Sequence, residues 1–289
     1  MVGQRCVDSK RQSVLYASNT DARRSGQSRK HAMFQSFDNK STPQFGKARV
    51  EALRAIFDAL GIDGFLVPRA DEYQGEYVPE CAERMAWLTG FTGSAGVVLV
   101  TRSQAIVFVD GRYTTQLASL VDPAVFTGGD LVGEPPHLWL RNHGPRGFRL
   151  GIDPWLHTGA EVRRLEKTLA ELGGQLVFLP YNPLDRAWTD RPAEPLGRVV
   201  IQDIDHAGEL AKDKLVTMAA ATAKAGADVL AVTDPSSIAW IFNIRGSDVP
   251  HTPPPLARAI IPAEGRPQLF LDKRKTGIEP EAYLTQLAD

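Results

Sequence analysis

A serine flanked by glycines is the first feature of this sequence that could carry chemistry. Thr92-Gly93-Ser94-Ala95-Gly96 resembles the turn that presents a nucleophilic serine in many hydrolases. That turn needs glycines two residues before and two residues after the serine, and it leads from a strand into a helix. Here Thr92 takes the first glycine position, and an apolar run typical of a strand follows at 97–100. We therefore predict that Ser94 is not a catalytic nucleophile.

The same segment has glycines at positions 90, 93 and 96, which could suggest a cradle for phosphate. Phosphate loops work because backbone N–H groups at the N-terminus of a following helix point at the anion. Since a strand is expected to follow, the sequence predicts a tight turn instead.

The densest group of potential metal ligands is Asp203, Asp205, His206 and Glu209. A metal site would require these side chains to converge on one ion. They immediately precede a helical pattern, where capping and the helix dipole favour acidic residues. The remaining histidines, at 31, 137, 143, 157 and 251, form no metal-binding motif. The sequence therefore predicts neither metal ligands nor catalytic residues in this chain.

Arg112 is the strongest candidate for a binding residue. It lies in Asp110-Gly111-Arg112-Tyr113, at the expected first turn of a helix over 112–120. A cation there opposes the helix dipole, at a cost of roughly 0.3–1 kcal/mol. An ion pair with Asp110 would offset that cost. Alternatively, the guanidinium is presented to a carboxylate of a ligand or another domain. The local sequence leaves both explanations open.

These residues must be positioned by alternating helices and short apolar strands. Three-residue and four-residue spacing of apolar side chains predicts helices at 46–60 and 159–172, whereas short apolar runs predict buried strands. The expected strands lie at 65–67, 97–100, 106–109, 150–152 and 176–179, the second and third of them forming a hairpin. This order predicts an α/β fold with a mixed sheet flanked by helices. Three prolines between 182 and 195 indicate a linker.

Beyond this linker the pattern repeats. A helix is expected at 212–225 and a strand at 229–232, and the text of 85–94 has a counterpart at 238–247 with the same spacing. A second hairpin, at 259–261 and 269–271, ends in Asp272-Lys273-Arg274, where the first ended in Asp110-Gly111-Arg112. The sequence therefore predicts two tandem copies of one unit. The second copy lacks the strand, long helix and closing strand of the first, so we expect it to be incomplete.

Composition limits the class of protein. The 289 residues have a formal net charge of −1, which gives no field that would attract nucleic acid or anionic lipid. Two cysteines, Cys6 and Cys81, are too few for a disulfide framework and indicate a cytoplasmic location. Residues 1–42 begin with a basic, serine-rich segment without apolar periodicity, from which we expect a disordered extension. This extension could be a targeting segment, or an early translation start followed by the true start at Met33.

Several motifs in series resemble the N-terminal domains of Xaa-Pro aminopeptidases of the three-domain type. They are Glu76-Tyr77-Val78-Pro79, Trp87-Leu88-Thr89-Gly90-Phe91-Thr92-Gly93-Ser94-Ala95-Gly96, Val109-Asp110-Gly111-Arg112-Tyr113, Gly151-Ile152-Asp153-Pro154, Trp188-Thr189-Asp190-Arg191-Pro192 and Ile238-Ala239-Trp240 through His251. The resemblance covers residues 43–289. It implies two creatinase/prolidase-like N-terminal domains, at 43–196 and at 197–289, with the second incomplete and without the catalytic pita-bread domain.

The resemblance also implies a function. Such enzymes use a dinuclear metal centre, usually manganese, to remove an N-terminal residue that precedes proline. All ligands of that centre belong to the catalytic domain, so none carries over to this sequence. The N-terminal domains restrict access to short peptides, and the arginine that matches Arg112 contributes to peptide binding. Homodimers form in the family, largely through the catalytic domain. We therefore expect a non-catalytic part of such an enzyme, or alternatively a stand-alone module that binds peptides or a partner.

Overall fold

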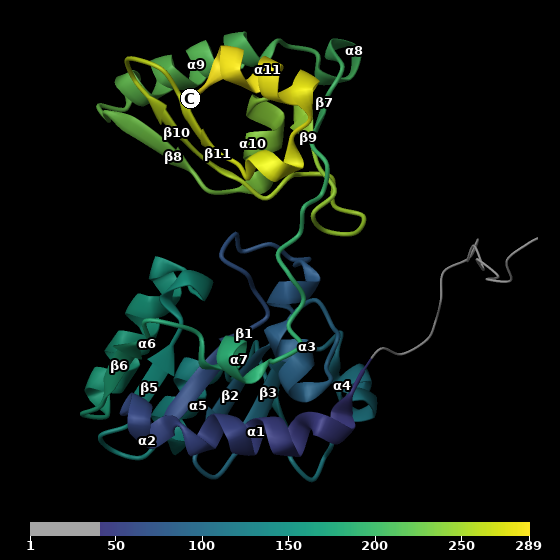
Figure 1. The fold of residues 1–289 in the computed structure, drawn as a ribbon. Coiled ribbons are helices and arrows are strands. Elements are labelled where there is room, and N and C mark those ends of the chain that lie inside the picture. Colours follow the sequence, from purple (N-terminus) through teal and green to yellow (C-terminus); the bar gives the residue numbers. More distant parts are fainter. Residues whose placement is uncertain (1–40) are drawn as a thin grey trace, which may run out of the picture. The chain divides into compact units, whose positions relative to one another are not determined.

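The computed structural model describes residues 41–289, and the structural statements below concern these residues. The predicted extension, residues 1–42, lies almost entirely outside them. We keep the predicted ranges and name 43–196 the N-terminal domain and 197–289 the C-terminal domain (Figure 1).

The N-terminal domain is a six-stranded mixed sheet with helices on both faces. Its strands are β1 (Gly64–Pro68), β2 (Val97–Thr101), β3 (Ala105–Val109), β4 (Thr127–Asp130), β5 (Arg149–Ile152) and β6 (Gln175–Phe178). Its helices are α1 (Gly46–Ala55), α2 (Phe57–Leu60), α3 (Arg84–Thr89), α4 (Thr114–Leu120), α5 (Pro136–His143), α6 (Gly159–Glu171) and α7 (Pro183–Ala187). Short 3-10 turns span Pro43–Phe45, Glu80–Ala82 and Pro154–Leu156. The strand order is β4-β3-β2-β1-β5-β6.

Strand directions confirm the mixed sheet and the hairpin. Neighbours β1–β2 and β2–β3 are antiparallel, whereas β3–β4, β1–β5 and β5–β6 are parallel. Strand β4 and helix α5 were not predicted because they lack apolar runs, and the helix expected from Arg112 begins only at Thr114.

Side chains of β1 point alternately to two apolar clusters. Phe65 and Val67 pack with Val50 of α1 on one face, whereas Leu66 packs with Leu140 and Leu165 on the other face. Because successive strand residues point to opposite faces, a continuous apolar run is expected where both faces are covered. The sheet therefore lies between two helical layers (Figure 1).

A carboxylate fixes the register between β1 and β5. Asp63 accepts hydrogen bonds from Arg149 at the backbone N (3.0 Å), Nε (2.9 Å) and Nη2 (2.9 Å), and from Nε of Arg102 (3.3 Å). These bonds, with Arg149 first, lower the pKa of Asp63 from 3.8 to about 2.

Replacing Asp63 with asparagine is expected to remove part of the acid dependence of stability. Because the pKa is lowered in the folded state, the carboxylate stabilises the fold above about pH 4, and this contribution disappears as the pH falls towards 2. Its partners are partly exposed, so we expect a loss of about 1–2 kcal/mol at pH 7 that vanishes near pH 2. Urea unfolding between pH 7 and pH 2 measures this change. Asp58→Asn is the control because Asp58 pairs with the same Arg102 but is 87% exposed; equal effects of both variants would contradict the assignment.

The stretch predicted as a linker, 182–195, begins as part of the N-terminal domain, so that prediction was wrong for its first half. Asn182 caps α7 by accepting from the N–H of Leu184, whose side chain is fully buried. Trp188 stacks on Trp87 with ring centroids 5.5 Å apart. Prolines signal irregular backbone, but Pro183 occupies the first turn of a helix, where it is well tolerated.

The C-terminal domain has a smaller sheet. Its strands are β7 (Val200–Ile201), β8 (Val229–Val232), β9 (Ile244–Arg245), β10 (Arg258–Pro262) and β11 (Gln268–Phe270). Its helices are α8 (Ile204–Ala207), α9 (Ala211–Lys224), α10 (Pro235–Ile241) and α11 (Ile278–Leu287), with a 3-10 turn at Lys273–Lys275. Strands β11-β10-β8 form an antiparallel sheet, and β7 pairs with β9.

The two domains repeat the same plan, which supports the duplication read from the sequence. The order β11-β10-β8 reproduces β3-β2-β1 in pairing and direction. In each copy a cation on a helix before the first strand of the larger sheet donates to a tryptophan carbonyl and lies over that ring: Arg49 of α1 with Trp87, and Lys214 of α9 with Trp240. Arg49 precedes β1 by the same number of residues by which Lys214 precedes β8.

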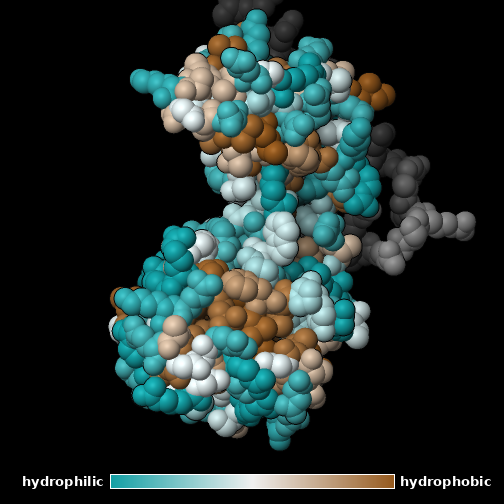
Figure 2. Space-filling view, turned by 90° about the vertical axis from the view of Figure 1, so that its left-hand side faces the viewer, coloured by the Kyte–Doolittle hydropathy of each residue, from teal (hydrophilic) through white to brown (hydrophobic). Residues whose placement is uncertain are grey.

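The two copies differ at the edge of β1 and of β8 that faces away from the following hairpin. In β1 the edge pairs with β5, and Phe65 is 1% exposed. Within the described residues no strand pairs with that edge of β8, where Val229 and Leu230 are 52% and 38% exposed. Figure 2 shows hydrophobic areas at the surface of both domains.

Candidate functional site

Arg112 lies in an exposed turn between β3 and α4. Its Nη2 lies 2.8 Å from Oδ2 of Asp110, its backbone N donates to Oδ1 (2.9 Å), and the side chain is 67% exposed. The hydrogen bonds from Arg112 lower the pKa of Asp110, and Asp110 in turn raises the pKa of Arg112. The ion pair expected from the local sequence is therefore present, and the guanidinium still faces outward.

A short polar chain connects this turn with the glycine-rich segment. The hydroxyl of Tyr113 lies 2.9 Å from Oγ of Ser94, which also donates to Oε1 of Glu76 (3.0 Å). The guanidinium of Arg112 lies 5.3 Å from the ring centroid of Tyr113. We name Glu76, Ser94, Asp110, Arg112 and Tyr113 the Arg112 cluster. It combines one exposed cation with hydroxyl and carboxylate groups, an arrangement that can hold a charged end of a ligand.

The glycine-rich segment is a tight turn, as predicted. Gly90 has φ +86° at the end of α3, a conformation that favours glycine. A Cβ at Gly93 would lie 2.3 Å from the ring of Phe91 and 2.8 Å from the ring of Tyr113. Strand β2 follows Ser94, so the serine does not lie on a turn from strand into helix. The turn places Ser94 beside Tyr113 and provides no nucleophile geometry.

The C-terminal domain contains the same local turn. Arg274 donates to Asp272 through its backbone N (2.9 Å) and Nη2 (2.6 Å), and its side chain is also 67% exposed. The two arginines therefore have matching exposure and matching partners. The Asp-x-Arg geometry alone does not distinguish a binding residue from a structural ion pair.

The residues that follow the two turns make different contacts. Tyr113 contacts Ser94 in the first copy, whereas Nζ of Lys275 lies 2.8 Å from Oδ2 of Asp248 in the second. Asp248 also accepts from the N–H groups of Gly197 (2.9 Å) and Leu256 (2.7 Å). The sequence analysis did not find this buried ion pair, because its two residues lie far apart in the sequence and belong to no shared local motif.

The acidic cluster near residue 205 caps a helix. Asp203 is the N-cap of α8 and accepts from the N–H of Asp205 (2.8 Å). Among residues 41–289, no three His, Cys, Asp or Glu side chains lie together as a metal site would require. No helix in that range is long and apolar enough to span a bilayer.

Comparison with family models gives the class of each half. Both residues 49–180 and residues 190–288 match models of the creatinase/prolidase N-terminal domain. The fold and these matches define a protein with two such domains in tandem.

Longer proteins that are similar to most of this chain define the family more closely. Aminopeptidase P2 of Arabidopsis thaliana is 32% identical over 86% of this chain, which spans 37% of that protein. A probable Xaa-Pro aminopeptidase P of Coccidioides posadasii is 34% identical over 78% of the chain, which spans 38% of it. The crystal structure of an X-prolyl aminopeptidase from Caenorhabditis elegans, described as a cytosolic enzyme with a di-nuclear active site, matches 83% of the chain and 41% of that protein, with 28% identity and a TM-score of 0.78. The chain belongs to the aminopeptidase P family.

Proposed function

We propose that this chain forms the N-terminal, non-catalytic part of an Xaa-Pro aminopeptidase and controls which peptides reach the active site. The observation that carries the proposal is the similarity to Xaa-Pro aminopeptidases across both domains, over 86% of the chain for the Arabidopsis protein. The chain spans only 35–39% of the length of such relatives. Their activity on peptides with proline in the second position is therefore part of the proposal.

The metal centre of the proposed enzyme does not fit the residues described here. A dinuclear site needs several His, Asp and Glu side chains around two ions, and residues 41–289 bring no three such groups together. We therefore place the metal, manganese in the proposal, on a separate catalytic domain and derive no step through it. A cytoplasmic location and homodimerisation through that domain belong to the same proposal.

Arg112 is the residue that we propose to contact peptide. It is an exposed guanidinium beside hydroxyl and carboxylate groups, and a guanidinium pairs well with a carboxylate. The exposure supports this role because no reorganisation of the core is needed to bind a ligand.

The test compares Arg112 with its counterpart in the second copy. This chain would replace the matching region of the Arabidopsis relative, and the chimera would be assayed for release of glycine from Gly-Pro-Leu with manganese. Arg112→Ala is expected to lower kcat/KM about tenfold or more, as expected for loss of one charge-assisted hydrogen bond. Arg274→Ala is expected to change it less than twofold. Both arginines are 67% exposed and pair with an aspartate two residues earlier, so local stability is matched.

Equal effects of the two variants would remove Arg112 from the proposal. Release of glycine by the isolated chain with manganese would contradict its non-catalytic role. Micromolar binding of Gly-Pro-Leu to the isolated chain would favour the alternative, a stand-alone peptide-binding module.

A further inference from the structure

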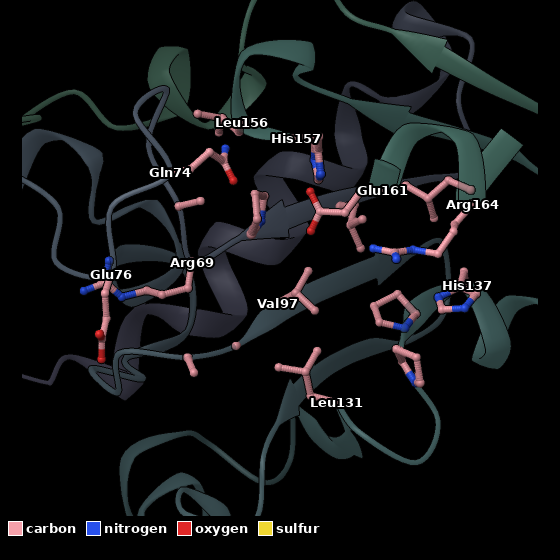
Figure 3. Close-up of a pocket in the computed structure, with 18 of the residues that line it drawn as sticks. Arg69, Gln74, Glu76, Val97, Leu131, His137, Leu156, His157, Glu161 and Arg164 are labelled. Carbon is pink, nitrogen blue, oxygen red and sulfur yellow. The ribbon is translucent and has the colours of Figure 1, made fainter. Parts of the chain in front are cut away.

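The N-terminal domain contains a cavity of about 760 Å³ at the carboxyl ends of β1 and β5. Its walls come from the segments that follow these two parallel strands, together with the turn before β2 and the first turns of α5 and α6. Figure 3 shows Arg69 and Glu76 on one side of the cavity and His157, Glu161 and Arg164 on the other.

Topology explains why a cavity forms here. After β1 the chain passes to α3, which packs with the cluster that contains Phe65, whereas after β5 it passes to α6, which packs with the cluster that contains Leu66. Adjacent parallel strands whose connections leave to opposite faces open a crevice at their carboxyl ends, where α/β proteins bind ligands. The volume lies in the range of small-molecule sites.

The floor of the cavity is apolar and comes from Leu66, Val97, Leu131, Leu156 and Leu165. Four of these residues, Leu66, Val97, Leu156 and Leu165, are buried in the core, which gives the floor a fixed shape. Such a surface favours an apolar ligand body.

On the cavity walls, the buried side-chain atoms that lack a hydrogen-bond partner are nitrogen atoms. Three buried side-chain nitrogens lack a hydrogen-bond partner among the described residues, and two of them, Nη1 of Arg69 and Nε2 of His157, belong to residues that line this cavity. The side chain of Arg69 is 6% exposed. Buried polar groups are nearly always paired, so unpaired ones point to a missing partner.

Each of the two carboxylates that line the cavity is hydrogen-bonded through one oxygen. Oε2 of Glu161 accepts from the backbone N–H and hydroxyl of Thr158, and Oε1 of Glu76 accepts from Ser94. By contrast, Arg164 at the rim is exposed and forms no ion pair within residues 41–289. Burial first, and then the charges of Arg164 and Arg141, lower the pKa of the neighbouring His137.

We propose that this cavity binds a small ligand with an apolar body and one carboxylate, which pairs with Arg164. The exposed and unpaired guanidinium of Arg164 suits a carboxylate, and the floor suits the apolar body. Nη1 of Arg69 leaves a buried hydrogen-bond donor for a polar atom of the same ligand. This proposal does not rest on the proposed function.

The test uses the full chain with N-acetyl-phenylalanine and its uncharged amide, which share the same body. The acid is expected to bind with a submillimolar Kd by calorimetry, and the amide at least tenfold more weakly. Arg164→Gln is expected to weaken binding of the acid about tenfold. Arg163→Gln is the control because Arg163 neighbours Arg164 on α6 but does not line the cavity.

Equal binding of acid and amide, or equal effects of the two arginine variants, would overturn the proposal, and so would absence of binding by both compounds. Both arginines are exposed, so neither variant threatens the fold. A tripeptide arm, Ala-Ala-Phe against Ala-Ala-Phe amide, distinguishes the carboxyl terminus of a peptide from a small free acid.

Discussion

Replacing Asp248 with alanine is expected to destabilise the C-terminal domain by about 3–5 kcal/mol, the usual cost of leaving one charge of a buried pair without its partner. The side chains of Asp248 and Lys275 are 0% and 7% exposed, and their charged atoms lie 2.8 Å apart. The substitution also removes the acceptor for the N–H groups of Gly197 and Leu256. Urea unfolding followed by hydrogen exchange in β10 measures the change in free energy of unfolding.

Two further variants make this result interpretable. Arg274→Ala removes an exposed ion pair of the same domain and should change the free energy of unfolding far less than Asp248→Ala does. The double variant Asp248→Asn with Lys275→Met removes both charges and keeps one acceptor at position 248. It should be more stable than Asp248→Ala, because no unpaired cation stays buried. If the double variant is instead the less stable of the two, burial of an unpaired charge is not the cause.

The sequence predicted the elements that have a strong local pattern. The β2–β3 hairpin, the amphipathic helix α6 and Gly61 at the end of α2 each depend on a few adjacent residues. The repeat was readable for the same reason, since both copies keep the Ala-Trp turn and the Asp-x-Arg turn. Strand β4 was missed because Thr127-Gly128-Gly129-Asp130 has almost no intrinsic strand preference. It forms because β3 offers a parallel edge that it can join.

The candidate site, too, was predictable only where its contacts join residues that are neighbours in the sequence. The pair of Arg112 with Asp110 spans two residues and was one of two local explanations. The contact of Tyr113 with Ser94 joins two elements, and the cavity joins residues from five segments. Such juxtapositions depend on which strands become neighbours in the sheet. A sequence pattern limits that order but does not determine it.

Replacing Asp185 with alanine is expected to destabilise the N-terminal domain by about 3–5 kcal/mol. Nε and Nη2 of Arg84 donate to the two oxygens of Asp185 at 2.6 and 2.8 Å, and the side chain of Arg84 is 6% exposed. Nη1 of Arg84 already lacks a hydrogen-bond partner, so Asp185 provides the only side-chain hydrogen bonds to this guanidinium among the described residues. Burial opposes the charged form of Arg84, yet the bonds from Asp185 raise the pKa of Arg84 overall.

Asp190→Ala is the matched control, because it removes an exposed acid of the same segment without a hydrogen bond to Arg84. It should change the free energy of unfolding by less than about 0.5 kcal/mol, the usual range for surface substitutions. A large loss for Asp185 with none for Asp190 would place the boundary of the N-terminal domain beyond α7. Equal and small losses would mean that the ion pair between α7 and Arg84 adds little to the stability of the N-terminal domain. The same measurement therefore tests whether the only acidic residue of α7 compensates a buried guanidinium.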